Sequence, residues 1–169
     1  MMSARTRPEE VKKEHIKKIF REILLSDVYT MAPESISVKE SIDKGTSEIT
    51  CSYVSGGRKK KLKYSGNGVV DALFTGLCLT NVQKYKSLKR IRFSNFVVKA
   101  DFDTKERQSG SDSDVLVVLE TVNEKGQKMI FRHLGKSVNF SSTRAVFEAV
   151  EFYVNCELCF KKLVSLTEE

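Results

Sequence analysis

The sequence predicts an α+β fold in which one N-terminal helix precedes two tandem βββα units. Strand-like and helix-like runs follow one another in the same order twice along the chain, which is one sign of an internal repeat. The glycine spacing is another: Gly57 and Gly66 are nine residues apart, and so are Gly126 and Gly135. Each pair brackets a returning strand, and each second glycine precedes a helix. A duplicated unit of three strands and a helix therefore accounts for both observations.

The elements of the first half follow from local patterns. A helix is expected from Thr6 to about Asp27, because Thr6 and Glu9 fit a capping box and apolar residues then recur at helical spacing. Three runs are expected as strands: 36–38, which alternates briefly, 48–54, which is rich in β-branched and aromatic residues, and 58–64, a basic run with Leu62 and Tyr64 on one face. Gly56 and Gly57 form the turn between the last two. A second helix is expected over 69–79, with its buried side formed by Val69, Val70, Leu73, Phe74 and Leu77.

The second half repeats this order. Strands are expected at 91–102, 115–122 and 127–134, with a turn at 123–126. The last helix is expected to begin near Ser141 or Ser142. Its apolar stripe is predicted as Val146, Ala149, Val150, Tyr153, Phe160, Leu163 and Val164.

The domain organisation follows from these elements. Residues 1–30 are interpreted as an N-terminal helix and linker, and 31–169 as one domain with repeats at about 35–80 and 88–165. The two repeat helices share an Ala-aliphatic-Phe motif, at 72–74 and 145–147, and matching these motifs makes the second strand-to-helix loop four residues longer. Residues 101–114 are interpreted as a charged loop that offers almost nothing to bury.

The composition indicates a globular protein. The chain has 169 residues, of which 40% are hydrophobic, and a chain of this length buries roughly 68–70% of its unfolded surface. No apolar run approaches the ~18 residues of a membrane span. The N-terminal segment lacks the apolar stretch of a secretory signal. We therefore expect a cytoplasmic protein, without membrane association, whose cysteines are reduced.

The residues do not fit the common catalytic arrangements. The only two histidines, His15 and His133, are far apart in sequence, and neither belongs to a nucleophile or metal-binding motif. Cys156 and Cys159 have CxxC spacing, but zinc sites need further ligands and redox motifs sit at a helix start. We interpret both as structural thiols within a helix. We therefore expect a protein that is not an enzyme and has no cofactor and no metal site.

The net charge of +7 is compatible with an anionic partner, and Lys and Arg concentrate in two runs, 58–63 and 84–92. Such runs can contact phosphates, and Tyr64, Tyr85 and Phe93 lie nearby as stacking groups. The same runs are interspersed with apolar residues at strand spacing, as on the solvated face of a sheet. No nucleic-acid-binding signature accompanies them. We favour the solvated face and keep a nucleic acid as the alternative.

Residues 65–72, Ser-Gly-Asn-Gly-Val-Val-Asp-Ala, carry the most information about function. Gly66 and Gly68 flank Asn67 and allow close approach to the backbone. The helix that follows directs free N–H groups into this loop, where a carboxylate binds well, and Asp71 can accept from an ammonium group. The stretch fits either a site for a zwitterionic amino acid or a simple turn in which Asp71 offsets the helix dipole. These eight residues alone favour the simple turn.

A family resemblance adds to this interpretation. Residues 66–73, Gly-Asn-Gly-Val-Val-Asp-Ala-Leu, resemble the Gly-Asn/Asp-Gly-Pro-x-Asp-Ala signature of the C-terminal allosteric (dimerisation) domain of alpha-isopropylmalate synthases and citramalate synthases. Residues 95–100 are similar to the Asp-Tyr-x-Val-x-Ala strand of that family, and 144–150 to its last helix. Order and spacing agree over roughly 35–154. The fold of the family is two βββα units, which coincides with the repeat inferred above.

The resemblance implies a homodimeric module that binds leucine or isoleucine at its interface and inhibits a synthase whose catalytic barrel is N-terminal to it. It places effector contacts in the loop and the following helix, at Gly66, Asn67, Gly68, Val70 and Asp71. It places the pocket for the aliphatic side chain on one strand face, at Phe93, Phe96 and Ala100. An apolar pocket suits such a side chain on physical grounds as well.

The chain also departs from the family. Val69 replaces the usual Pro, Phe96 replaces Tyr, and the charged segment 101–114 replaces a short Gly-rich turn. A catalytic barrel needs about 250 residues, so a synthase partner would lie outside this sequence. Two other hypotheses remain: a basic nucleic-acid-binding module of the same fold, and a purely structural dimerisation partner of a separately encoded catalytic chain.

Overall fold

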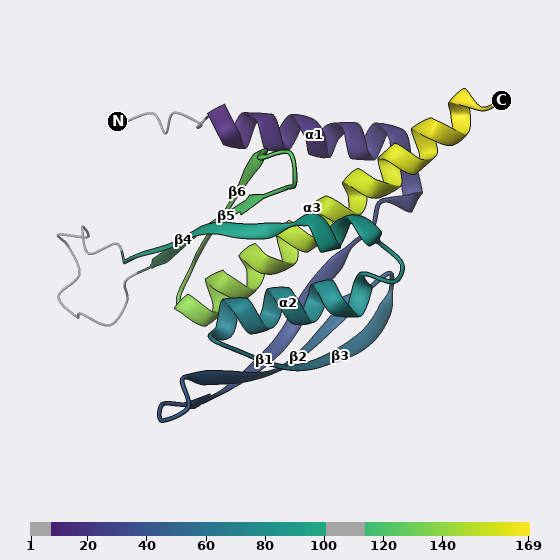
Figure 1. Ribbon diagram of the computed structural model, residues 1–169. Helices are drawn as coiled ribbons and strands as arrows, with labels where there is room; N and C mark the ends of the chain where they lie inside the picture. The colour runs from purple at the N-terminus through teal and green to yellow at the C-terminus, as the bar shows by residue number, and fades with distance from the viewer. Residues whose placement is uncertain (1–7, 101–113) are drawn as a thin grey trace.

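The computed structural model describes residues 8–100 and 114–169. Within these residues, three α-helices and two three-stranded antiparallel sheets form an α+β fold, which confirms the predicted class (Figure 1). The predicted capping residue Thr6 lies outside the described residues. So does the predicted charged loop at 101–114, apart from Asp114.

The elements follow one another as strand triplets and helices. The first helix, α1 (Pro8–Leu24), ends in a short 3-10 turn, η1 (Leu25–Asp27). The first sheet contains β1 (Met31–Ser41), β2 (Thr46–Ser55) and β3 (Arg58–Gly66), and α2 (Val69–Asn81) follows it. A second 3-10 turn, η2 (Lys86–Arg90), leads to the second sheet. This sheet contains β4 (Arg92–Ala100), β5 (Val115–Val122) and β6 (Lys128–Gly135), and α3 (Val138–Thr167) follows it.

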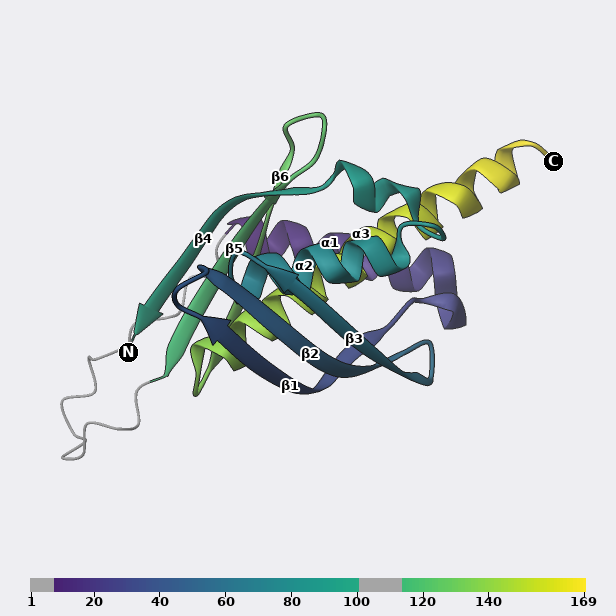
Figure 2. The ribbon, with the colours of Figure 1, turned by 60° about the horizontal axis from the view of Figure 1, so that its bottom comes forward.

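The helices cover the inward faces of the two sheets. Strand order is sequential in both, β1-β2-β3 and β4-β5-β6. α2 packs against β2 and β3, α3 packs against β5 and β6, and the two helices contact each other (Figures 1 and 2). α1 lies against α3 and β6. None of the helices in the described part of the chain is both long and apolar enough to cross a bilayer.

The core forms where the inward faces of the central strands meet α2 and α3. Alternate residues of β2 and β5 are almost fully buried: Ile49, Cys51, Tyr53, Val117 and Leu119. This alternation is what a strand with one solvated face produces. The predicted turn between β2 and β3 is confirmed, because Gly56 and Gly57 both have positive φ (56° and 74°), as a two-residue hairpin turn requires.

The last helix begins earlier than predicted. α3 starts at Val138, and the side chain of its N-cap, Ser137, accepts from the Phe140 N–H (3.0 Å). Ser141 and Ser142, predicted at the helix start, are buried inside the first turns. Both strand-to-helix connections therefore contain two residues, 67–68 and 136–137, and the predicted four-residue difference is wrong. A shift of four residues is about one helical turn, which preserves the apolar face and so conceals the error.

The predicted apolar stripe of α3 is buried only in its first half. Its first four members are buried: Val146, Ala149, Val150 and Tyr153. The last three are 38–69% exposed: Phe160, Leu163 and Val164. The reason is that α3 extends beyond the sheets at its C-terminal end (Figure 1).

Candidate functional site

The loop between β3 and α2 is closed by Asp71. One carboxylate oxygen of Asp71 accepts from the backbone N–H of Asn67 (3.0 Å), and the other accepts from the Thr75 hydroxyl (3.4 Å). Asp71 therefore stabilises the first turn of its own helix, near the positive end of the helix dipole. This is the simple-turn role that the eight residues favoured. An ionised carboxylate has about four acceptor sites, so both oxygens keep capacity for a ligand.

The two glycines of the loop have different roles. A Cβ on Gly66 would lie 2.6 Å from Asp71 Oδ2 and 2.9 Å from the backbone N of Ala72, so packing excludes any side chain there. Gly68 has open space around it and provides no side-chain cap for α2. The N–H groups of the first helical turn therefore face an open approach, which is a suitable place for an anionic group.

A β-bulge in β4 places the predicted pocket residues on one face. In a regular strand Phe93 and Phe96 would point to opposite faces of the sheet. The pairing of β4 with β5 shifts at Ser94, so that Phe93 opposes Thr121 and Phe96 opposes Leu119. Both β5 residues belong to the buried inward face, and directly paired residues share a face. Phe93 and Phe96 therefore both point inward.

The inward face of β4 is uncovered over its second half. Phe96 and Val98 are 39% and 41% exposed, and Ala100 is exposed as well. The β5 residues opposite Phe96 and Val98, by contrast, are fully buried: Leu119 and Val117. Val98 was not among the predicted pocket residues, although it follows Phe96 at strand spacing. These three residues form an apolar strip on the edge strand, which we call the β4 strip.

α2 connects the loop to the β4 strip. The rings of Phe74 and Phe93 pack with their centroids 4.3 Å apart. α2 and β4 run in opposite directions (Figure 1), so the half-buried Val70, one turn before Phe74, lies toward the Phe96 end of the strand. The structure thus gathers the loop, the start of α2 and the β4 strip at one end of the molecule.

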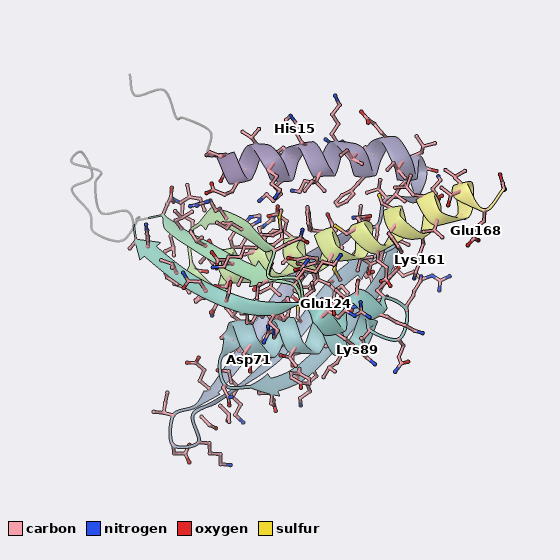
Figure 3. All side chains as sticks on the ribbon, turned by 45° about the horizontal axis from the view of Figure 1, so that its top comes forward. His15, Asp71, Lys89, Glu124, Lys161 and Glu168 are labelled. Atoms are coloured by element: carbon pink, nitrogen blue, oxygen red, sulfur yellow. The ribbon has the colours of Figure 1, made fainter. Side chains whose placement is uncertain are left out.

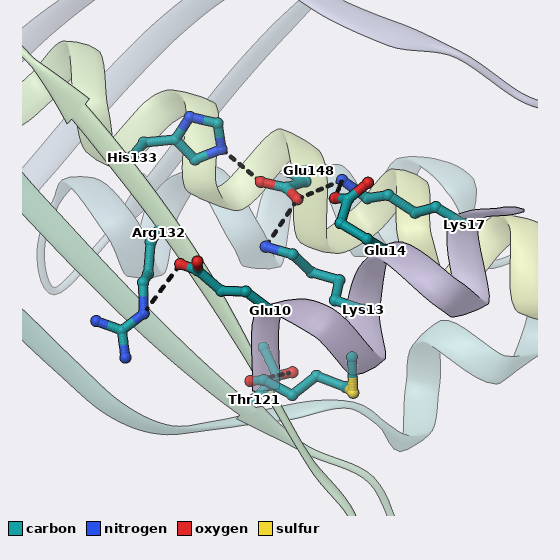
Figure 4. A network of polar contacts seen from close by, with 9 residues as sticks. Glu10, Lys13, Glu14, Lys17, Thr121, Arg132, His133 and Glu148 are labelled. Atoms are coloured by element: carbon teal, nitrogen blue, oxygen red, sulfur yellow. Dashed lines mark hydrogen bonds and ion pairs between the residues drawn. The ribbon is translucent and has the colours of Figure 1, made fainter. Parts of the chain in front are cut away.

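A second polar cluster, which the sequence did not indicate, joins α1, β6 and α3 (Figure 4). The Glu148 carboxylate accepts from Lys17 (2.7 Å) and pairs with Lys13 (3.1 Å), and its other oxygen contacts His133 Nε2. Lys13 is 5% exposed, and its ammonium also lies over the Phe131 ring. No sequence spacing could have found this cluster, because Lys17 and Glu148 are 131 residues apart.

The contacts of Glu148 connect α1 to β6 and α3, and they stabilise its ionised form. Burial alone would raise the pKa of Glu148, but hydrogen bonds from His133 and Lys17 and the charge of Lys13 lower it to about 2. A pocket of ≈ 250 Å³ between α1 and α3 adjoins the cluster. Its polar wall is already engaged, since Glu151 accepts from the Met31 N–H (2.9 Å) and Asn155 from the Tyr29 N–H (2.8 Å).

The remaining candidates occupy ordinary structural positions. His15 is exposed on α1. Cys156 and Cys159 are free thiols within α3, and burial raises the pKa of Cys156 to about 12, which makes it a poor nucleophile at neutral pH. Among residues 8–100 and 114–169, no group of three or more His, Cys, Asp or Glu side chains is placed to hold a metal ion.

The two basic runs lie on different elements. Residues 58–63 belong to the edge strand β3, where Lys59 and Lys63 pair with Glu34 and Glu48 (3.5 and 3.6 Å). Residues 84–92 form η2 and the segments on either side of it. The run on β3 is thus partly neutralised by acidic residues on the other two strands of its sheet.

Comparison with known proteins adds no family to these observations. No protein-family model matches the chain, and no curated protein matches it either.

Proposed function

We propose that this chain is a non-catalytic regulatory module that binds a branched-chain amino acid and dimerises, similar to the allosteric domain of alpha-isopropylmalate and citramalate synthases. The observation that carries the proposal is the position of the β4 strip beside the open start of α2. One end of the molecule then offers free N–H groups, a carboxylate and an uncovered apolar surface. Leucine and isoleucine have the matching three parts.

Each part of such a ligand has a partner in this arrangement. The ligand carboxylate is held by the first-turn N–H groups of α2, next to Gly68. The ligand ammonium donates to Asp71, whose oxygens keep free lone pairs. The aliphatic side chain lies on the β4 strip and is recognised by its apolar surface, as in most small-molecule sites. The loop glycines let the ligand approach the backbone.

The tandem repeat supports the same family-like architecture. Gly66 and Gly135 close the third strand of each sheet, opposite Ser47 and Val115. A helix begins three residues after each glycine. The first strand of each sheet also carries a pairing irregularity near its start, at Pro33/Ser35 in β1 and at Phe93/Asn95 in β4. We infer two equivalent βββα halves, preceded by α1.

Dimerisation follows from the uncovered strip. A second copy of the chain that covers the strip would complete the apolar pocket and bury the effector across a two-fold axis. The effector then stabilises one arrangement of the dimer, and coupling to a barrel-type synthase partner requires different affinities for two such arrangements. A module of this kind needs no catalytic residues of its own.

The test is thermal unfolding against leucine, isoleucine, valine and unrelated amino acids. A ligand that binds only the folded state at ~100 times its Kd stabilises it by about 2.7 kcal/mol. We expect a selective rise in Tm with leucine or isoleucine. Asp71→Asn removes the charge that holds the ammonium and should abolish the rise, and Asp43→Asn in the exposed β1–β2 turn should preserve it. If no amino acid raises the Tm of the unaltered chain, the proposal is wrong.

A further inference from the structure

A groove lies at the opposite end of the molecule from the Gly66–Gly68 loop. It has a volume of ≈ 580 Å³ and runs between η2, the β5–β6 turn and the C-terminal half of α3. This volume lies within the ~300–1,000 Å³ of typical binding sites. Figure 3 shows Lys89, Glu124 and Lys161 around this end, whereas Asp71 marks the other end of α2.

Cations from two separate elements line this groove: Lys86 and Arg90 from η2, and Lys125 from the β5–β6 turn. Their concentration is not an average property of the chain. The runs 58–63 and 84–92 together hold ten of the 29 basic residues, and all 22 acidic residues lie outside them. Basic residues are therefore concentrated in these two runs, where they attract anions. Of the two, the run 84–92 contributes residues to the groove.

The acidic residues of the groove are already engaged. Glu124 pairs with Arg90 (2.8 Å), and Glu157 accepts from the Ser87 hydroxyl (3.2 Å) and pairs with Lys161 (3.4 Å). Within the described residues, Lys86 and Lys125 have no ion-pair partner. Lys86 and Lys125 thus remain available to an anionic ligand, and Arg90 keeps further N–H donors because only its Nη1 contacts Glu124.

An exposed aromatic ring completes the groove. Phe160 of α3 lines it with 69% of its surface exposed, although phenylalanine is among the residues most often buried. Ile91, Tyr153 and Cys156 provide an apolar floor beside it. An aromatic ring and several cations in one groove suit a single-stranded nucleic acid, because its bases stack on aromatic rings and its phosphates bind positive charge.

We propose that this groove binds single-stranded nucleic acid, with Phe160 as a stacking surface and Lys86, Arg90 and Lys125 as phosphate contacts. The cations lie inside a concave site, which suits an extended single strand rather than a flat anionic membrane. A duplex keeps its bases stacked and cannot use Phe160. This surface is distinct from the proposed amino-acid site, so either proposal can fail alone.

The primary test is fluorescence anisotropy of the full chain with a short labelled single-stranded oligonucleotide over a range of salt concentrations. The variant Lys86→Gln, Arg90→Gln, Lys125→Gln removes three phosphate contacts. Each contact contributes about 0.7 to the slope of log K against log salt for single strands, so we expect the slope to fall by about 2. The matched control, Lys59→Gln, Lys61→Gln, Lys63→Gln on β3, removes the same charge and should leave the slope largely unchanged.

The stacking role has its own readout. Phe160→Ala should weaken binding to the single strand by roughly five-fold or more, since stacking on one aromatic ring contributes at least that factor. The Tm of the Phe160→Ala variant should equal that of the unaltered chain, because the Phe160 ring is mostly exposed. Equal falls of the salt slope in the two triple variants, or no effect of Phe160→Ala on binding, would overturn the proposal. So would binding to anionic vesicles or duplex DNA that matches or exceeds binding to the single strand.

Discussion

At the scale of single residues, Glu148 illustrates how a buried charge is made tolerable. Its carboxylate is 15% exposed and meets two ammonium groups, Lys13 and Lys17, together with His133. Each of these contacts comes from another element of the fold, so the residue joins α1 and β6 to α3. Removing one member of such a group leaves the others buried without a partner, which costs more than the group contributes as a whole.

Replacement of Glu148 by glutamine should therefore destabilise the protein strongly. Lys13, which is 5% exposed, would keep its charge without a carboxylate, and breaking a buried pair in this way costs roughly 3 kcal/mol or more. Urea unfolding at neutral pH measures the loss. Glu14→Gln is the control: Glu14 is 60% exposed and pairs with Lys17 on its own helix, so its removal should cost less than about 0.5 kcal/mol. Equal losses in the two variants would contradict this account.

The same cluster predicts a pH dependence. The pKa of Glu148 falls from 4.5 to about 2 in the fold. A carboxylate with a depressed pKa stabilises the fold above its unfolded pKa, and this contribution is lost as pH falls through the folded pKa. Stability should therefore decline between about pH 4.5 and pH 2, and this decline should be shallower in Glu148→Gln. Parallel acid-unfolding curves for the two proteins would show that other carboxylates dominate.

At the scale of elements, the presence of strands and helices could be predicted better than the residues at which they begin and end. The runs at 115–122 and 58–64 are both expected as strands, and the structure places β5 and β3 there. β1 is longer than predicted, because residues 32–35 lack the apolar alternation that predicts a strand, although they pair with β2. The start of α3 was misplaced by about a turn, since an apolar helical stripe looks alike when shifted by four residues. The ends of an element depend on capping and strand pairing, and apolar periodicity alone does not predict these.

The strand-to-helix glycines give a prediction at this scale. Gly66→Ala should destabilise the fold by about 1–3 kcal/mol, the usual cost of overpacking, because its Cβ would meet the backbone of Ala72 at 2.9–3.0 Å. Gly68→Ala, two residues away, meets nothing within 4 Å and should cost only about 0.5 kcal/mol, because alanine is a poorer N-cap than glycine. Thermal unfolding distinguishes the two. A larger loss for Gly68→Ala would mean that the loop backbone differs from this geometry.

At the scale of the whole molecule, the sequence predicted the fold class and the loop, but not how the pieces meet. The β4 strip depends on a bulge at Ser94, and the Glu148 cluster on the docking of α1. Both are long-range features that no local pattern encodes. The β4 strip shares the sheet's inward face with buried β5 residues, yet remains open. Within one chain this face is incomplete, which is why the proposed assembly is a dimer.

The dimer is tested by placing a charge on each face of the second sheet. Phe96 is 39% exposed on the inward face, and Leu134 is 59% exposed opposite Leu116 on the other face. We expect the unaltered chain to sediment as a dimer, Phe96→Lys to sediment as a folded monomer, and Leu134→Lys to remain dimeric. Because both positions are exposed in the single chain, neither change should unfold it. Dissociation by Leu134→Lys alone would move the interface to the outer face of the sheet. A monomer at every concentration of the unaltered chain would remove the dimer from the proposal.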